Sequence, residues 1–97
     1  MAALDRKVRI HPEVVSTELG DGEAALLHLE TKTYYSLNTT GARVWQGLQQ
    51  GLTPRQISEH LQSEFEVGRE KAERCVLELL RDLTDQELVQ ADSERET

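Results

Sequence analysis

The stretch AALLHLETKTYYSLNTTGARVW, residues 24–45, decides the fold that we expect for this chain. It contains two short apolar runs, Ala24–Leu29 and Tyr34–Leu37, with a polar corner at Glu30–Thr33 between them. Two apolar runs around a short polar corner are typical of a tight antiparallel hairpin. Residues 24–37 are therefore predicted to form two paired strands.

A helix is predicted directly after the hairpin. Residues 38–40, Asn-Thr-Thr, offer side-chain oxygens that can cap the free N–H groups of a helix. We expect this helix to begin near Gly41 or Ala42 and to end at Gly51, a suitable C-terminal glycine. The residues that it should turn toward the core are Val44, Trp45 and Leu48.

One more strand is predicted before the hairpin. Val14–Leu19 alternates imperfectly and ends at Gly20-Asp21-Gly22, a strong turn sequence. With the hairpin it makes a three-stranded antiparallel meander, and Val8–Ile10 is a short extended piece ahead of it. The last strand should lie at a sheet edge, because a helix follows it and no further strand covers it. Its unpaired N–H and C=O groups are then a slot for a visiting peptide.

Side-chain alternation along a strand predicts which residues are buried. Tyr34 and Ser36 are expected to face outward, although a shift of one residue in register would exchange the two faces. The residues expected to face the core are Ala25, Leu27 and Leu29 in the second strand, and Tyr35 and Leu37 in the third, Thr33–Leu37.

Two more helices are predicted in the second half of the chain. Thr53 is a suitable N-cap, and Pro54 suits the first helical turn. A third helix should run from about Gly68 to Leu83, and the short turn between the first two helices indicates a helix-turn-helix pair. The fold class is therefore α+β and winged helix-turn-helix-like, a three-stranded antiparallel meander followed by three helices. The second helix should bury Ile57, Leu61 and Phe65.

The third helix has a core face and a flanking strip. At roughly 100° per residue, Cys75 and Leu79 lie at the margin of the core face. Lys71, Glu78 and Asp82 follow beyond that margin, in line along one side. If the strip faces the edge strand, the two form a groove with an apolar floor and a polar rim. The core face itself contains Ala72, Val76, Leu80 and Leu83.

Composition excludes several classes of protein. With 97 residues the chain is one domain, assigned to residues 1–90, and residues 91–97 are predicted to be a disordered acidic tail. Asp and Glu outnumber Lys and Arg by 18 to 11, with the excess in the C-terminal third, which disfavours binding to nucleic acid. No long apolar run and no signal-peptide pattern occur, so we expect a cytoplasmic protein without membrane contact.

Reactive residues are few and are interpreted as structural. Cys75 is the single cysteine, and a cysteine at an apolar helix margin is usually a small packed hydrophobic residue. His11, His28 and His60 are scattered and lack metal-ligand spacing, so neither a metal nor another cofactor is predicted. No group that would orient a Cys–His pair is apparent. We therefore expect a protein that is not an enzyme.

A run of residues in the hairpin and the first helix resembles the PqqD-like family. These small proteins bind leader peptides and are called recognition elements of ribosomally made, post-translationally modified peptides (RiPPs). The chain is most similar to the stand-alone leader-binding half of a split lasso-peptide B protein, over about Val14 to Val89. Lys32 and Glu87 stand where glycine is usual. The resemblance rests on Leu27–Thr31, Tyr34–Asn38 and Thr40–Trp45.

The resemblance implies a function and a site. Family members bind the leader as an added antiparallel strand on the third strand beside the third helix, and a split B protein delivers it to a separate, transglutaminase-like cysteine protease. Two copies can also pair through the edge strand as a homodimer. The implied peptide-binding residues are Thr33, Tyr34, Tyr35, Ser36, Leu37 and Asn38 on the strand, and Lys71, Cys75, Glu78, Leu79 and Asp82 on the helix.

Two alternatives stay open at this point. The first is a PqqD-like peptide chaperone for a radical SAM enzyme, which the family name suggests. The second is an acidic winged-helix regulator, which would need a basic partner or a dimer interface. The sequence also leaves open which of Tyr34 and Tyr35 faces the leader.

Overall fold

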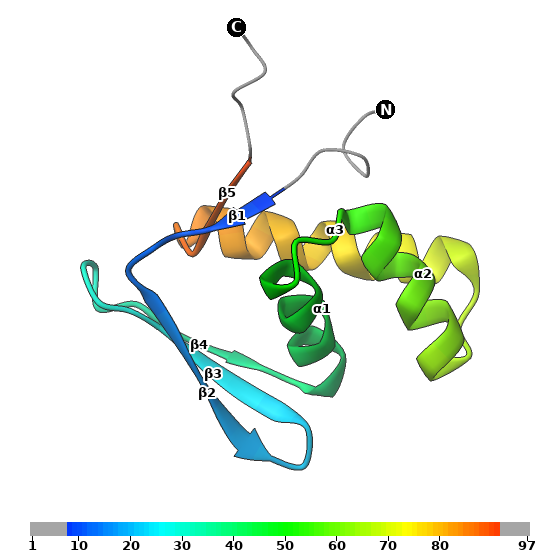
Figure 1. Cartoon of the computed structure of the whole chain (residues 1–97), viewed down its shortest axis with the longest axis horizontal. Coiled ribbons are helices and arrows are strands. Elements are labelled where there is room, and N and C mark those ends of the chain that lie inside the picture. The colour runs from blue at the N-terminus through cyan, green and yellow to red at the C-terminus, as the bar shows by residue number, and fades with distance from the viewer. Residues whose placement is uncertain (1–7, 92–97) are drawn as a thin grey trace, which may run out of the picture.

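Two antiparallel sheets and three helices make up residues 8–91, the part of the chain that the computed structural model describes. In Figure 1 the three-stranded sheet lies beside α1, and α2 lies beyond α1. This is the predicted α+β order of a three-stranded antiparallel sheet followed by three helices. The elements are β1 (Val8–Ile10), β2 (Val14–Gly20), β3 (Glu23–His28), β4 (Tyr34–Leu37), α1 (Thr39–Gln49), α2 (Pro54–Phe65), α3 (Arg69–Asp85) and β5 (Val89–Ala91).

The predicted meander is confirmed, with strand order β2-β3-β4. Ser16 lies opposite Leu26, and Leu26 lies opposite Tyr35, so these three side chains share the face that turns toward the helices. Within residues 8–91, β2 and β4 are the two edge strands of this sheet. Their position leaves one side of each strand unpaired.

The buried face of β3 is the opposite of the predicted one. Leu26 and His28 are buried, Ala25 is half-buried, and Leu27 and Leu29 are 38% and 42% exposed. The predicted core set of Ala25, Leu27 and Leu29 is therefore wrong. Residues 24–29 are apolar at every position but one, so alternation does not show which face of the strand is buried. The one polar residue, His28, favours the wrong face because it is itself buried.

His28 can be buried because the hairpin corner satisfies one of its ring nitrogens. Its Nδ1 accepts hydrogen bonds from the backbone N–H groups of Glu30 (3.2 Å) and Thr31 (3.3 Å). In β4 the predicted faces are confirmed. Leu37 is buried and Tyr35 half-buried on the inner face, whereas Tyr34 and Ser36 are exposed on the outer face.

Four residues other than glycine adopt the left-handed backbone region within residues 8–91, namely Asp21, Lys32, Glu66 and Glu87. Lys32 has a φ of +65° and Glu87 a φ of +62°. These are the two positions where the sequence departs from the glycine of the family pattern. The backbone therefore keeps a glycine-like shape at both turns, at a cost of about 1–2 kcal/mol for each residue.

The capping residues predicted from the sequence begin the helices. Asn38 Oδ1 accepts the Gly41 N–H at 2.8 Å, so α1 begins at Thr39, two residues before the predicted start. Thr53 caps α2 and forms a reciprocal capping box with Gln56. Gly68 precedes α3, which continues to Asp85, beyond the predicted end at Leu83.

The three helices meet in one core. Trp45 on α1, Leu61 on α2 and Val76 on α3 are all buried, as the helical spacing predicts. Phe65 is only partly buried against this core. A Cβ on Gly47 would lie 2.7 Å from Ile57 Cγ1, so glycine allows the close approach of α1 and α2. The other predicted helical core residues, all buried, are Val44, Leu48, Ile57, Ala72, Leu80 and Leu83.

A two-stranded ribbon closes the described chain. β1, predicted as an extended piece, pairs antiparallel with β5, which was not predicted, and Ile10 lies opposite Val89. Figure 1 shows the ribbon beside α3. Ala91 ends β5, and residues 1–7 and 92–97, including the rest of the predicted tail, lie outside the described residues. No helix within residues 8–91 is long and apolar enough to cross a membrane.

Candidate peptide-binding groove

The free edge of β4 exposes the backbone groups of alternate residues. The His28 N–H donates to the Thr33 carbonyl at 2.9 Å, so these two residues form a hydrogen-bonded pair of the ladder. Bonded and non-bonded pairs alternate along antiparallel strands. Tyr34, opposite Leu27, and Ser36 therefore direct their N–H and C=O groups away from β3, toward the open side.

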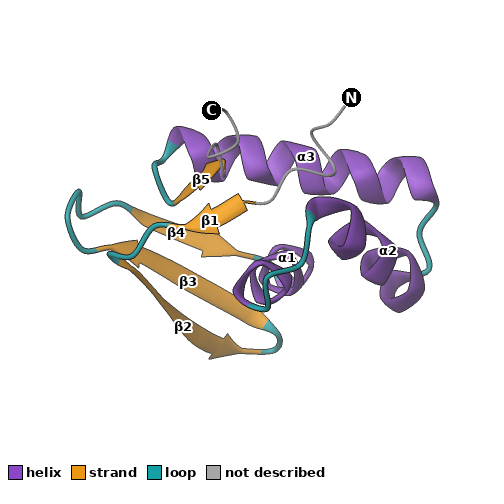
Figure 2. Cartoon of the chain, turned by 45° about the horizontal axis from the view of Figure 1, so that its top comes forward, coloured by secondary structure: helices purple, strands orange, loops and turns teal. Residues whose placement is uncertain are grey.

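A hollow lies beside this edge. Its cavity volume is about 360 Å³, and it is lined by four consecutive residues, Tyr35 to Asn38, together with Leu79 of α3. Figure 2 shows that β4, and not β2, is the edge strand on the side of α3. An added strand on β4 would therefore meet an apolar side chain of the neighbouring helix.

Tyr35 links β4 to α3. Burial of its hydroxyl, the negative charge of Asp82 and a hydrogen bond to that carboxylate raise the pKa of Tyr35. Its ring turns inward, whereas Tyr34 is 59% exposed on the outer face of the sheet. Of the two tyrosines, only Tyr35 lines the hollow.

The remaining predicted residues do not line this hollow. Cys75 is a half-buried free thiol, and Lys71 and Glu78 are exposed on α3. Glu78 instead borders a shallow depression with Arg74 and Arg81. Thr33 is half-buried and its hydroxyl lies 2.8 Å from the hydroxyl of Thr31, within the hairpin corner.

Sequence reasoning missed two residues of the hollow, Glu23 and Gly41. Glu23 begins β3, and the pairing of Ala24 with Leu37 brings it to the end of β4. Gly41 is buried in the first turn of α1 because that helix begins at once after β4. The hairpin register would have identified Glu23, whereas no local pattern indicates Gly41.

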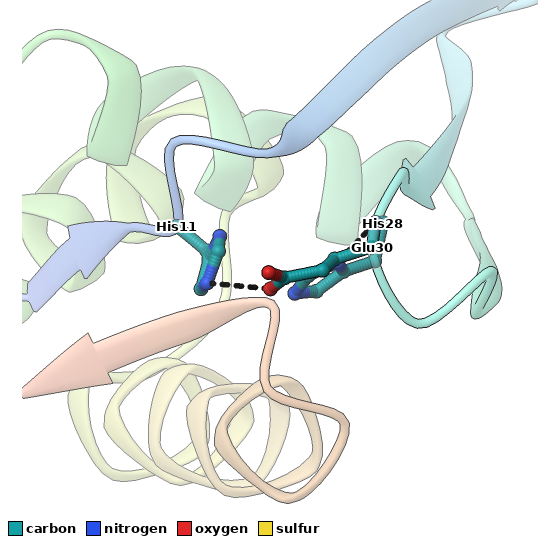
Figure 3. A group of neighbouring side chains, drawn as sticks. All are labelled: His11, His28 and Glu30. Carbon is teal, nitrogen blue, oxygen red and sulfur yellow. Dashed lines mark hydrogen bonds and ion pairs between the residues drawn. The ribbon is translucent and has the colours of Figure 1, made fainter.

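The structure corrects the prediction that the histidines are scattered. The rings of His11 and His28 lie 4.3 Å apart, and Glu30 Oε1 lies 3.9 Å from His11 Nε2 (Figure 3). Ligand atoms of these three residues all lie within 4.8 Å of one another. His60 belongs to α2 and is not part of this cluster.

The hydrogen bonds around the histidines do not suit a metal ion. Nδ1 of His11 accepts the Glu13 N–H at 3.0 Å, and Nδ1 of His28 accepts two backbone N–H groups. With Nδ1 as the acceptor, the proton of each ring is on Nε2, the nitrogen that would have to coordinate. A metal-bound imidazole instead donates from its second nitrogen. The cluster connects the β1–β2 turn to the hairpin corner.

One family model and two solved structures match most of the chain. The family model described as "Coenzyme PQQ synthesis protein D (PqqD)" matches residues 23–89. The solved structure of TbiB1 in complex with the TbiA(beta) leader peptide is 38% identical, with a TM-score of 0.79 over 84% of this chain and 93% of that one.

A second solved structure is similar over the same region. It is lasso peptide synthetase B1 complexed with the leader peptide, 31% identical, with a TM-score of 0.77 over 86% of this chain and 96% of that one. No curated protein sequence matches the chain. Both solved relatives therefore share its fold over nearly their whole length.

Proposed function

This chain belongs to the PqqD family as a PqqD-like RiPP recognition element, and we propose that it binds the leader of a ribosomally made precursor peptide. The leader adds as an antiparallel strand to β4, beside α3. The observation that carries this proposal is the unpaired backbone of Tyr34 and Ser36 next to the hollow that Leu79 lines. Main-chain pairing supplies affinity in such β-augmentation, and alternate side-chain pockets supply selectivity.

The energetics require an apolar anchor on the leader. Ordering a flexible peptide costs roughly 1–2 kcal/mol of backbone entropy per residue. Each net hydrogen bond returns about 0.5–1.5 kcal/mol, which barely offsets that cost. Burial of one leader side chain contributes roughly 1.5–3 kcal/mol more. Leu79 and Leu37, which meet in the hollow, are the surface against which such an anchor packs.

The proposed site residues on α3 have different roles. Leu79 forms the apolar wall, and the Asp82 carboxylate raises the pKa of the Tyr35 hydroxyl. Lys71, Cys75 and Glu78 lie on the same side of α3, where a leader longer than the hollow would extend past them. Thr33 and Asn38 border the two ends of the pairing segment.

The bound leader is then delivered to a separate enzyme. Similarity to lasso peptide synthetase B1 favours a transglutaminase-like cysteine protease that removes leaders, and this chain has a recognition role without catalysis. The PqqD family match favours a second candidate, a peptide chaperone for a radical SAM enzyme. The precursor gene next to this one, and the enzyme genes around it, distinguish the two.

The same free edge can also join two copies of the chain when no leader is present. Antiparallel pairing of two β4 strands would satisfy the N–H and C=O groups that the leader otherwise binds. Analytical ultracentrifugation tests this arrangement. A dimer that dissociates when leader is added supports it, and a concentration-independent monomer without leader contradicts it.

Calorimetric titration with the leader encoded beside the gene tests the proposal, using two matched proline variants. Ser36→Pro removes an N–H from the free edge of β4, and Ser16→Pro removes one from the free edge of β2. We expect Ser36→Pro to abolish binding and Ser16→Pro to preserve it, with both folds intact by circular dichroism. Equal binding by the wild type and both variants would contradict strand addition on β4.

A further inference from the structure

A second hollow lies between β2, the β2–β3 turn and α1. Its volume is about 150 Å³, comparable to an engineered cavity that can hold a benzene-sized group, roughly 150 Å³. Its floor is apolar and contains Ala24, Ala42 and Trp45. Ser16 and Gln49 form one wall, where Gln49 Nε2 lies 3.4 Å from Ser16 Oγ. The space can therefore receive one side chain of a visiting molecule.

The end of β2 gives this hollow its shape. The register between β2 and β3 shifts between Glu18 and Gly20, which is a β-bulge. Gly20, Asp21 and Gly22 then reverse the chain with φ values of +88°, +54° and +80°. Bulges bend an edge strand and re-aim its side chains. The bulge and the turn place Glu18 and Glu23 together on the rim of the hollow.

The rim is negatively charged and has no internal counter-charge. Glu18 and Glu23 are the charged residues that line the hollow, and neither forms an ion pair within residues 8–91. Gln49 adds an amide oxygen that can accept a hydrogen bond, since its nitrogen is the atom that lies near Ser16. The chain as a whole has a formal net charge of −7, which favours encounters with basic partners.

We propose that this hollow binds an arginine side chain presented by a segment of a partner protein. A guanidinium group is planar, carries five N–H donors and is weakly hydrated, so it can lie on an apolar floor while it donates to surrounding oxygens. Its charge-assisted hydrogen bonds to Glu18 and Glu23 would be stronger than neutral ones. A lysine ammonium is compact and strongly hydrated and would leave the floor uncovered.

The arginine site is separate from the leader groove. The leader groove follows β4 and α3, whereas the arginine site follows β2 and α1, and β3 lies between the two edge strands. Glu23 borders both hollows, but Glu18 borders only the arginine site. Glu18 therefore distinguishes the two sites, and the inference does not depend on the proposed leader function.

The single tryptophan of the chain provides a direct readout, because Trp45 forms part of the floor. The probe is N-acetyl-arginine methylamide, titrated into the full-length, nitrogen-15-labelled protein while the indole N–H resonance is followed. We expect a saturable shift of this resonance. N-acetyl-citrulline methylamide, the neutral isostere, should bind about fivefold more weakly or worse.

Two variants that each remove one glutamate charge test whether the arginine probe binds at this hollow. Glu18→Gln should weaken binding of the arginine probe about fivefold. Glu59→Gln, on the exposed surface of α2, should leave it unchanged. Calorimetric titration with the leader should give the same affinity for wild type and Glu18→Gln, which distinguishes the two sites.

Three results would overturn the proposal. They are no saturable shift with the arginine probe, an equal response to the citrulline probe, or equal weakening by Glu18→Gln and Glu59→Gln. The comparison of arginine with citrulline uses the wild-type protein, so it decides the question even if Glu18→Gln fails to fold. If the wild-type protein responds to the arginine probe but does not bind the leader, the proposed leader function is refuted and the arginine site is not.

Discussion

The two edge strands of the three-stranded sheet differ in what lies beside them. β4 borders the hollow that Leu79 of α3 lines, and its Leu37 is buried. β2 is exposed along most of its length and ends in a β-bulge. Both strands have free backbone groups, but only at β4 does an apolar side chain of α3, that of Leu79, lie beside them. Under the proposed function, a free edge alone does not make a peptide site, and the neighbouring helix decides which edge the leader uses.

The largest expected difference between the two edges concerns stability. Leu37→Ala removes a buried side chain of β4 and should lower the free energy of unfolding by about 2–5 kcal/mol. Val15→Ala removes a side chain of β2 that is 44% exposed and should cost less than about 1 kcal/mol. Urea denaturation measures both. Equal losses would mean that β4 is not part of the core.

The next largest effect concerns the helical wall of the groove. Leu79→Ala should weaken leader binding by about 1–2 kcal/mol, because the anchor side chain loses part of its apolar contact. Gln49→Ala on α1, beside β2, is the matched control and should leave leader affinity unchanged. Calorimetry compares the two variants. A larger loss with Gln49→Ala would assign the leader to the β2 side.

A smaller effect should follow from the link between Tyr35 and Asp82. Tyr35→Phe removes the hydroxyl on which Asp82 acts and should lower stability by about 1 kcal/mol. The raised pKa of Tyr35 means that, above the ordinary value of 10.0, the unfolded chain loses this proton before the folded one. The folded protein therefore loses stability as pH rises above 10.0, and the variant should lose less. Denaturation series across this range in both proteins would show the difference, and parallel profiles would contradict it.

The smallest effect should come from the side chain of Ser36. Because this side chain faces outward while the backbone faces the free edge, Ser36→Ala should change leader affinity by less than about twofold. Isothermal titration beside Ser36→Pro separates the two contributions. A tenfold loss with alanine would mean that the hydroxyl, and not the main chain, makes the contact.

Much of the fold was predictable because local chemistry specifies it. Asn38 and Thr53-Pro54 begin α1 and α2, and helical spacing identified the buried face of α3. The face of β3 was not predictable in this way, since its run is apolar on both sides and only the pairing with β4 decides it. β5 has only three residues, which are too few to show a periodicity in the sequence. It forms because β1, at the other end of the described chain, pairs with it.

The candidate site shows the same division. Tyr35, Leu37 and Leu79 were predicted, and the structure brings them together in one hollow. The contact of Tyr35 with Asp82 depends on the spacing of β4 and α3, which no local pattern specifies. The approach of His11 to His28 likewise joins a turn and a strand that are far apart in the sequence.

Amide hydrogen exchange on the wild-type protein, with and without the leader, tests most directly whether β4 receives the added strand. We expect the backbone amides of Tyr34 and Ser36 to become protected when the leader is added, while those of Ser16 and Glu18 on the free edge of β2 do not. Protection at Ser16 and Glu18 with none at Tyr34 and Ser36 would contradict strand addition at the α3 side.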